Sequence, residues 1–294
     1  QPSRQLYGTL AGAAIIAVMG VIDDCKNLPA KLKFVIQIIA ALVVVFAGDI
    51  KIDVFTNPNF LSDNPYWVLP EWLSVTLTVI WIVFITNAVN FIDGLDGLAA
   101  GVSAIMSISL VFISIRVGEY SIAILGIALM GSCFGFLPFN FNPAKIFMGD
   151  SGSMFLGYII AVIALLGFKN VTLTSFIIPI LLLAIPILDT LFAILRRLIN
   201  HKPLGEPDKN HLHHQLLRLK LSQKKTVIII YIVDLLFASA SIVYVVGNSM
   251  LGSNIYGMVI YAILFVLILL LILKTNIIWN HDKKKEKAKE ETKE

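Results

Sequence analysis

Long apolar runs separated by short polar segments recur along almost the whole chain, and they constrain its fold more than any other feature. A helix needs about 20 apolar residues to cross a bilayer, and about nine runs reach or approach that length. Only 14% of the residues are charged, whereas soluble domains carry about 25%. We therefore predict an all-α, polytopic membrane helix bundle. The predicted transmembrane helices, about nine in number, cover residues 6–22, 34–48, 71–89, 98–115, 120–138, 153–168, 174–195, 226–247 and 255–273.

Basic residues are distributed unevenly between the loops of this topology. If the loop at residues 23–33 is cytosolic and the later loops alternate, 19 of the 23 Lys and Arg residues lie on the cytosolic side. Cytosolic loops of membrane proteins carry such an excess, so we expect this orientation. This orientation places four polar clusters on the cytosolic face. We therefore expect the active site to be built from cytosolic loops. The clusters lie at residues 23–33, 87–97, 140–153 and 208–214.

The cluster NAVNFIDGLDGLAAG lies between two strongly apolar runs. Asn87 and Asn90 are three residues apart, as are Asp93 and Asp96, so in a helix each pair shares one face. The glycines between them let the backbone approach a bound group closely. A membrane protein that holds a hydrated Mg²⁺ and phosphate oxygens at the water boundary needs such a cluster. A simple connecting loop is the alternative.

Two adjacent carboxylates, Asp23 and Asp24, follow the first apolar run. They fall at the C-terminal end of a helix, where the helix dipole disfavours negative charge. A nearby cation would explain them, and three lysines, of which Lys33 is the last, follow within ten residues. The segment is either a solvated loop or an acidic pair that organises a metal or acts as a base, followed by phosphate-binding lysines.

The segment FNFNPAKIFMGDSGS places Asp150 directly before an apolar run that we predict to be helical. Free N–H groups at a helix start suit an anion, and a carboxylate there can also be a plain N-cap. Capping explains Asp150 or Ser151, but it does not require Asn140 in the same segment. We therefore favour a binding function for this loop.

Three histidines, His211, His213 and His214, lie in the longest cytosolic loop. A zinc site would need three or four ligands, but no cysteine or HExxH spacing accompanies them. Histidines that donate hydrogen bonds to phosphate fit better, and a solvated amphipathic helix is the remaining alternative.

Two carboxylates fall inside predicted spans. Such groups are functional candidates by default, but Asp189 is two turns from Arg196 and Arg197 and could pair with them. A structural role is therefore favoured for Asp189, and the same interpretation is applied to Asp234.

The four clusters together contain carboxylates, amides, lysines and histidines, without a serine or cysteine nucleophile in a recognisable context. That inventory suits Mg²⁺-assisted phosphoryl transfer, in which positioning and charge neutralisation supply most of the catalysis. A membrane transporter is a different class of function, but transporters bind near the midplane, whereas these clusters share one face. A non-catalytic lipid-binding relative is a third interpretation.

Four stretches resemble, in their order and spacing, the bacterial polyprenyl-phosphate N-acetylhexosamine-1-phosphate transferases. They are DDCKNLPAKLKFVIQ, NAVNFIDGLDGLAAG, FNFNPAKIFMGDSGS and PDKNHLHHQLL. The resemblance implies an enzyme of the bacterial cytoplasmic (inner) membrane that transfers a sugar 1-phosphate from a UDP-sugar to undecaprenyl phosphate and releases UMP. Its product would start teichoic acids, lipopolysaccharide O-antigen or other cell-envelope glycans. The HLHH form is similar to the N-acetylglucosamine (GlcNAc) branch. The muramoyl-pentapeptide branch, the alternative, typically has consecutive histidines followed by Phe-Glu, which this chain lacks.

The resemblance also implies roles for individual residues. The catalytic residues would be Asp23, Asp24 and Asp150, and the metal ligands Asn90 and Asp150. Substrate binding would involve Lys33, Asp93, Asp96, Asn140, His211, His213 and His214. The implied cofactor is Mg²⁺, with Mn²⁺ as an alternative. The implied partners are a UDP-N-acetylhexosamine, undecaprenyl phosphate and membrane lipids, with a homodimer as an open alternative and no nucleic acid.

The expected organisation is one transmembrane transferase domain over residues 1–274, followed by a charged, disordered cytosolic tail over 275–294. Family members usually have more spans than nine, so we expect an N-terminal part of the family fold to be missing from this chain.

Overall fold

The computed structural model describes residues 2–56, 66–168, 177–199 and 211–251, together with five residues between 259 and 266. Almost all of the predicted span at 255–273 and the whole predicted tail at 275–294 lie outside these residues.

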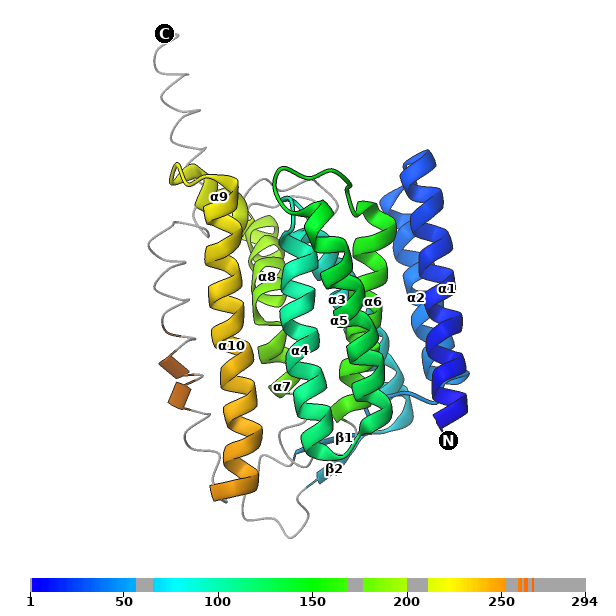
Figure 1. Cartoon of the computed structure of the whole chain (residues 1–294). Coiled ribbons are helices and arrows are strands. Elements are labelled where there is room, and N and C mark those ends of the chain that lie inside the picture. Colours follow the sequence, from blue (N-terminus) through cyan, green and yellow to red (C-terminus); the bar gives the residue numbers. More distant parts are fainter. Residues whose placement is uncertain are drawn as a thin grey trace.

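The described residues form a bundle of helices whose long axes run side by side (Figure 1). Two short strands, β1 (Val54–Thr56) and β2 (Tyr66–Val68), pair antiparallel at the end of the bundle that also holds the N-terminus. The prediction of an all-α bundle is confirmed apart from this small ribbon. The helices are α1 (Pro2–Lys26), α2 (Ala30–Phe46), α3 (Glu71–Ile92), α4 (Leu98–Val117), α5 (Tyr120–Asn140), α6 (Gly149–Phe168), α7 (Ile177–Leu182), α8 (Ala184–Ile199), α9 (Leu212–Arg218) and α10 (Gln223–Leu251).

Six of the described helices are long and apolar enough to cross a membrane: α1, α3, α4, α5, α6 and α10. The chain is thus a multi-pass membrane protein, but the predicted count of about nine spans is not confirmed. The predicted span at 34–48 corresponds to α2, whose 17 residues extend about 25 Å, short of the roughly 30 Å hydrocarbon layer.

The predicted span at 174–195 is not one continuous helix in the described residues, because α7 and α8 are separated at Leu183. Pro179 lies in α7 and Pro186 in the first turn of α8. Proline lacks the amide hydrogen that a helix interior requires, and its ring clashes with the carbonyl four residues earlier.

Helix α6 lies centrally in the bundle and packs against both α1 and α3. Side chains that reach a backbone carbonyl of a neighbouring helix fix its position. The buried Tyr158 hydroxyl donates to the Thr9 carbonyl of α1 at 2.9 Å, and the Trp81 indole of α3 donates to the Ala161 carbonyl at 3.1 Å. Because α6 begins with Asp150 in its first turn, these contacts also fix one end of the candidate site.

Three of the polar clusters, and residues 211–214 of the fourth, come to the same end of the bundle, opposite β1 and β2 (Figure 1). We call this end the polar face. It consists of the α1–α2 junction, the α3–α4 turn, the α5–α6 loop and α9.

Candidate active site

The start of α6 is capped by a carboxylate from another helix. Asp24, in the last turn of α1, accepts hydrogen bonds from the backbone N–H groups of Asp150 (2.9 Å) and Ser151 (3.2 Å). Gly149 permits this approach because its φ is +68°, and a Cβ there would lie 2.7 Å from Asp24 Oδ2. From the sequence, Asp150 or Ser151 was the candidate N-cap of this helix. In the structure Asp24 supplies the cap, and the Asp150 side chain makes other contacts.

Lys33, near the start of α2, joins two of the predicted catalytic carboxylates. Its ammonium lies 2.8 Å from Asp23 Oδ2 and 2.9 Å from Asp150 Oδ2. Asp23 is buried, and its other oxygen accepts from the Leu28 N–H at 2.7 Å. The lysine thus holds α1, α2 and α6 together through a partly exposed ion-pair cluster. The sequence predicted a cation near the acidic pair Asp23 and Asp24, and Lys33 is that cation.

Asn90, in the last turn of α3, completes this cluster. Its Nδ2 donates to Asp150 Oδ1 at 3.1 Å and to Ser153 Oγ at 2.8 Å. Because both bonds use the amide nitrogen, Oδ1 is the atom that Asn90 would offer to a cation. The sequence interpretation did not include Ser153, although it lies three residues after Asp150 and therefore on the same face of α6.

A pair of amides, the buried Gln37 and the partly buried Asn87, supports the cluster from inside the bundle. Asn87 Nδ2 donates to Gln37 Oε1 at 2.6 Å and to the Val83 carbonyl at 2.7 Å. Gln37 is four residues after Lys33, and Asn87 is three residues before Asn90, so each supports the helix face that carries a site residue. The sequence interpretation did not include Gln37 among the site residues. Gln37 is the only polar residue between 34 and 46, and a single polar residue in an apolar run indicates a buried polar contact.

An open pocket of about 360 Å³ adjoins Asp150 on the polar face. Burial, together with the nearby charges of Asp150 and Asp96, raises the pKa of Asp93 to about 7. Phe147, whose side chain is 78% exposed, forms part of the apolar wall. The pocket is lined by Asn90, Asp93, Gly94, Leu95, Asp96, Asn140, Phe147, Met148, Gly149 and Asp150.

Two of the predicted substrate-binding residues hold loops together. Asn140 is buried, accepts from the Gly97 N–H at 3.0 Å and donates to the Ile146 carbonyl at 3.0 Å. Asp96 accepts from Asn142 Nδ2 at 2.8 Å and from the Ala144 N–H at 3.2 Å. These bonds fix the α5–α6 loop against the α3–α4 turn and so shape the pocket.

The histidine motif lies at the start of α9, behind the same turn. His211 and His213 are buried, and their rings are parallel with centroids 5.8 Å apart. The His213–His214 centroid distance is 4.2 Å. Burial and the adjacent His214 and His211 rings lower the pKa of His213 to about 4, against the raising effect of Asp189. The ring of His213 is therefore neutral at pH 7.

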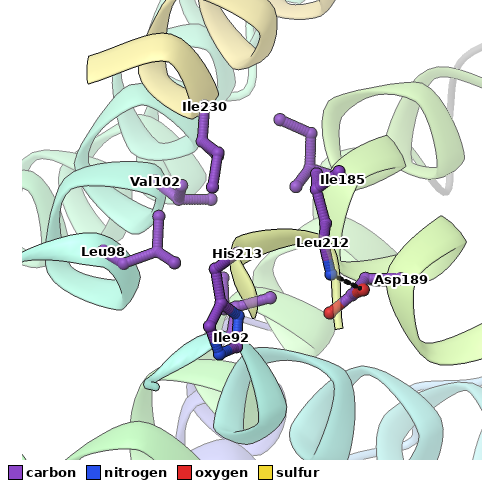
Figure 2. Close-up of a pocket in the computed structure, with 8 residues that line it drawn as sticks. All are labelled: Ile92, Leu98, Val102, Ile185, Asp189, Leu212, His213 and Ile230. Carbon is purple, nitrogen blue, oxygen red and sulfur yellow. Dashed lines mark hydrogen bonds between the residues drawn. The ribbon is translucent and has the colours of Figure 1, made fainter. Parts of the chain in front are cut away.

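His213 also lies against Gly94, which lines the pocket. A Cβ on Gly94 would lie 2.4 Å from His213 Nε2, so only glycine at position 94 allows α9 this close. A second, apolar space of about 10 Å³ adjoins His213 and Asp189 (Figure 2). It has room for one water molecule at most, so it is not a substrate site. Residues 200–210 of the predicted histidine loop lie outside the described part of the chain.

The donor atoms on the polar face are compatible with a magnesium ion. Within the described residues, no group of three His, Cys, Asp or Glu side chains is placed to hold a metal. Mg²⁺ in contrast commonly uses one or two carboxylates together with substrate phosphates and water. Asp150 and the Asn90 amide oxygen fit that smaller set.

Comparison with known proteins bears on this geometry. A model of glycosyl transferase family 4 matches residues 6–168, more than half of the chain. The chain belongs to this family. The matched residues include Asp23, Asp24, Lys33, Asn90 and Asp150, so the family segment contains the whole cluster around Lys33.

Two relatives from this family carry similar names. A probable undecaprenyl-phosphate N-acetylglucosaminyl 1-phosphate transferase of Bacillus subtilis is 47% identical over 79% of this chain and 64% of its own length. A decaprenyl-phosphate N-acetylglucosaminephosphotransferase of Mycobacterium leprae is 38% identical over 78% of this chain and 62% of its own. This chain thus spans less than two thirds of either relative.

A phospho-N-acetylmuramoyl-pentapeptide-transferase of Caldicellulosiruptor bescii is 39% identical, but over only 53% of this chain and 52% of its own length. The alignment with the two GlcNAc-phosphate enzymes therefore covers a larger share of this chain than the alignment with the muramoyl enzyme does.

The structure brings the predicted site residues to one face in three groups. Asp23, Asp24, Lys33, Asn90 and Asp150 form a connected cluster. Asp93 and Asp96 line the pocket beside it, and the histidines lie behind the pocket at Gly94. The catalytic, metal and substrate roles of these residues stay predictions.

Proposed function

We propose that the protein transfers N-acetylhexosamine 1-phosphate, with GlcNAc 1-phosphate as the first candidate, from a UDP-sugar to undecaprenyl phosphate. The proposal depends above all on one observation: Lys33, Asn90 and Asp150, from three separate helices, meet beside an open pocket. The names of the relatives and the family membership support the same reaction.

In the proposed reaction, an oxygen of the lipid phosphate forms a bond to the phosphorus that bears the sugar. The bond from that phosphorus to the bridging oxygen breaks, and UMP leaves with the electron pair. Positioning and charge neutralisation supply most of the catalysis in phosphoryl transfer. Lys33 supplies a positive charge at the cluster, and Asp24 holds the first turn of α6 so that Asp150 keeps its place.

The proposed cofactor is Mg²⁺, held by Asp150 and the Oδ1 of Asn90. When bound, the ion would neutralise charge on the diphosphate. Asn90 is oriented for this because its nitrogen donates to Ser153 and Asp150.

The pocket beside Asp150 is the proposed donor site. Its volume of about 360 Å³ lies at the lower end of the range for small-molecule sites. The pKa of Asp93, which lines the pocket, is raised to about 7, and the exposed ring of Phe147 offers an apolar surface. Since UDP-sugars are cytosolic, the polar face would face the cytosol from the inner membrane, as the loop charges also predict.

A UMP-release assay tests the proposal. The protein is reconstituted with undecaprenyl phosphate, Mg²⁺ and one UDP-sugar at a time, including UDP-GlcNAc and UDP-GalNAc. We expect UMP only when the lipid acceptor is present, no UMP after EDTA treatment, and loss of activity in Asp150→Ala. The matched control is Asp53→Ala, because Asp53 lies at the opposite end of the bundle beside β1. UMP release that persists with EDTA, or in Asp150→Ala, would contradict the assignment.

A further inference from the structure

Asp189, on α8, is a buried carboxylate that the proposed reaction does not use. Its side chain is only 3% exposed. The sequence pattern favoured a structural pairing with an arginine, but the partners that the structure shows belong to the histidine motif. Its Oδ2 lies 2.9 Å from His211 Nδ1, and its Oδ1 accepts from the Leu212 N–H at 2.7 Å.

The second of these bonds fixes the start of α9. The residue before this helix, His211, makes no side-chain capping bond, so the N–H of Leu212 would lack an acceptor without Asp189. The Asp189 carboxylate of α8 therefore caps the start of α9, and this bond fixes the position of α9 relative to α8 (Figure 2).

The first bond fixes the imidazole of His211. A carboxylate can only accept, so Nδ1 carries the hydrogen in this pair and Nε2 is the ring atom left for another partner. Partners of this kind, which hold a functional histidine from behind, set both its tautomer and its orientation. The His211 ring is also confined by the rings of Phe91 and His213, each with its centroid 5.8 Å away.

The start of α9 is in turn in contact with the proposed donor pocket. His213 lies against Gly94, which lines that pocket. A shift at the Asp189 contact would therefore move both the histidine motif and the α3–α4 turn.

We infer that Asp189 is a positioning residue of the transferase site, which acts through His211 and the first turn of α9. This inference rests on the proposed function, because it assigns Asp189 a role in that reaction. Asp189 itself need not touch substrate.

The experiment compares Asp189→Asn, His211→Gln and the double variant, each purified in detergent. Asparagine keeps the shape of aspartate but has only one accepting oxygen, so it cannot serve both His211 and Leu212. Proton NMR should show a downfield Nδ1–H resonance in the original protein. This resonance should be missing from His211→Gln. In Asp189→Asn it should be missing or shifted upfield, because a neutral amide oxygen accepts a weaker hydrogen bond than a carboxylate does. In the UMP-release assay, each single variant should lower kcat/KM by about 10–100-fold. The double variant should lose less activity than the product of the two single losses, because the two residues share one contact.

The matched control is Asp234→Asn, which changes another buried aspartate on the neighbouring α10. It should retain kcat/KM within about threefold and keep the Nδ1–H resonance. The inference is overturned if the resonance is unchanged in Asp189→Asn, if the two single losses multiply in the double variant, or if Asp234→Asn loses as much activity. The resonance does not depend on turnover, so an inactive protein that shows it would refute the transferase assignment and leave the Asp189–His211 pair established.

Discussion

Removal of the carboxylate of Asp24 tests whether this residue acts by capping α6. In Asp24→Ala, the backbone N–H groups of Asp150 and Ser151 lose acceptors at 2.9 and 3.2 Å. A lost cap typically costs about 0.5–2 kcal/mol, and the negative charge at a helix N-terminus contributes about 0.3–1 kcal/mol more. Since Asp24 is exposed to solvent, we expect a total of about 1 kcal/mol, at the lower end of these ranges.

For a chain of this size, that loss lowers the melting temperature by about 2–4 °C. Fraying of the first turn also displaces Asp150, so kcat/KM for the UDP-sugar should fall in the same variant. Asp24→Asn keeps one accepting oxygen, so its melting temperature should be intermediate. Both quantities are measured on detergent-solubilised protein, by thermal unfolding and by UMP release.

The control is Glu71→Ala, which removes an acidic residue from the first turn of α3 at the opposite end of the bundle. Glu71 contacts Lys51 at 3.5 Å and is 79% exposed, so neither quantity should change measurably. If Asp24→Ala loses activity but melts at the original temperature, the capping argument is refuted and a direct role as a base is favoured.

Three further changes test the same face. Gly149→Ala places a side chain at a φ of +68° with its Cβ 2.7 Å from Asp24, so it should lower both stability and kcat/KM. The control is Gly118→Ala, where φ is +86° but nothing lies within 4 Å of the added Cβ. It should lower stability alone. Lys33→Met leaves Asp23 and Asp150 without their shared cation, so kcat/KM should fall about tenfold or more, while Lys51→Met on the opposite end should leave it unchanged. The pKa of Asp93 is raised from 3.8 to about 7, so between these values the folded protein keeps a proton that the unfolded chain releases, and stability falls as pH rises. The lowered pKa of His213 acts in the opposite direction between about pH 4 and pH 6.5. The Asp93 contribution is therefore the difference in melting temperature between the original protein and Asp93→Asn, and this difference should fall as the pH rises from 4 to 8.

The sequence was sufficient to predict which segments meet on the polar face. Apolar run lengths and the positions of lysine and arginine fix the direction of each helix, and these directions bring the ends of α1, α3 and α5 together. The spacing of Asn87 and Asn90 likewise predicted that they share one face of α3. These inferences rest on local periodicity, which a single sequence contains.

The contacts between helices could not be predicted in the same way. Asp24 caps a helix that begins 125 residues later at Gly149, and Asp189 caps one that begins at Leu212. Such pairings depend on how the helices pack, because one carboxylate near a helix end has several candidate partners. The interruption at Leu183, by contrast, has a local signal in the sequence, because a proline lies on either side of it.

The most direct test of the account follows the β-phosphate of the sugar nucleotide. Reconstituted protein is incubated with undecaprenyl phosphate, Mg²⁺ and UDP-GlcNAc that carries a radioactive β-phosphate, and the label is measured in the lipid and aqueous phases. We expect the label to enter the lipid phase together with the sugar, unlabelled UMP to be released, and Asp150→Asn to abolish both. Sugar in the lipid phase while the label stays in water as UDP, or an unchanged rate in Asp150→Asn, would contradict this expectation.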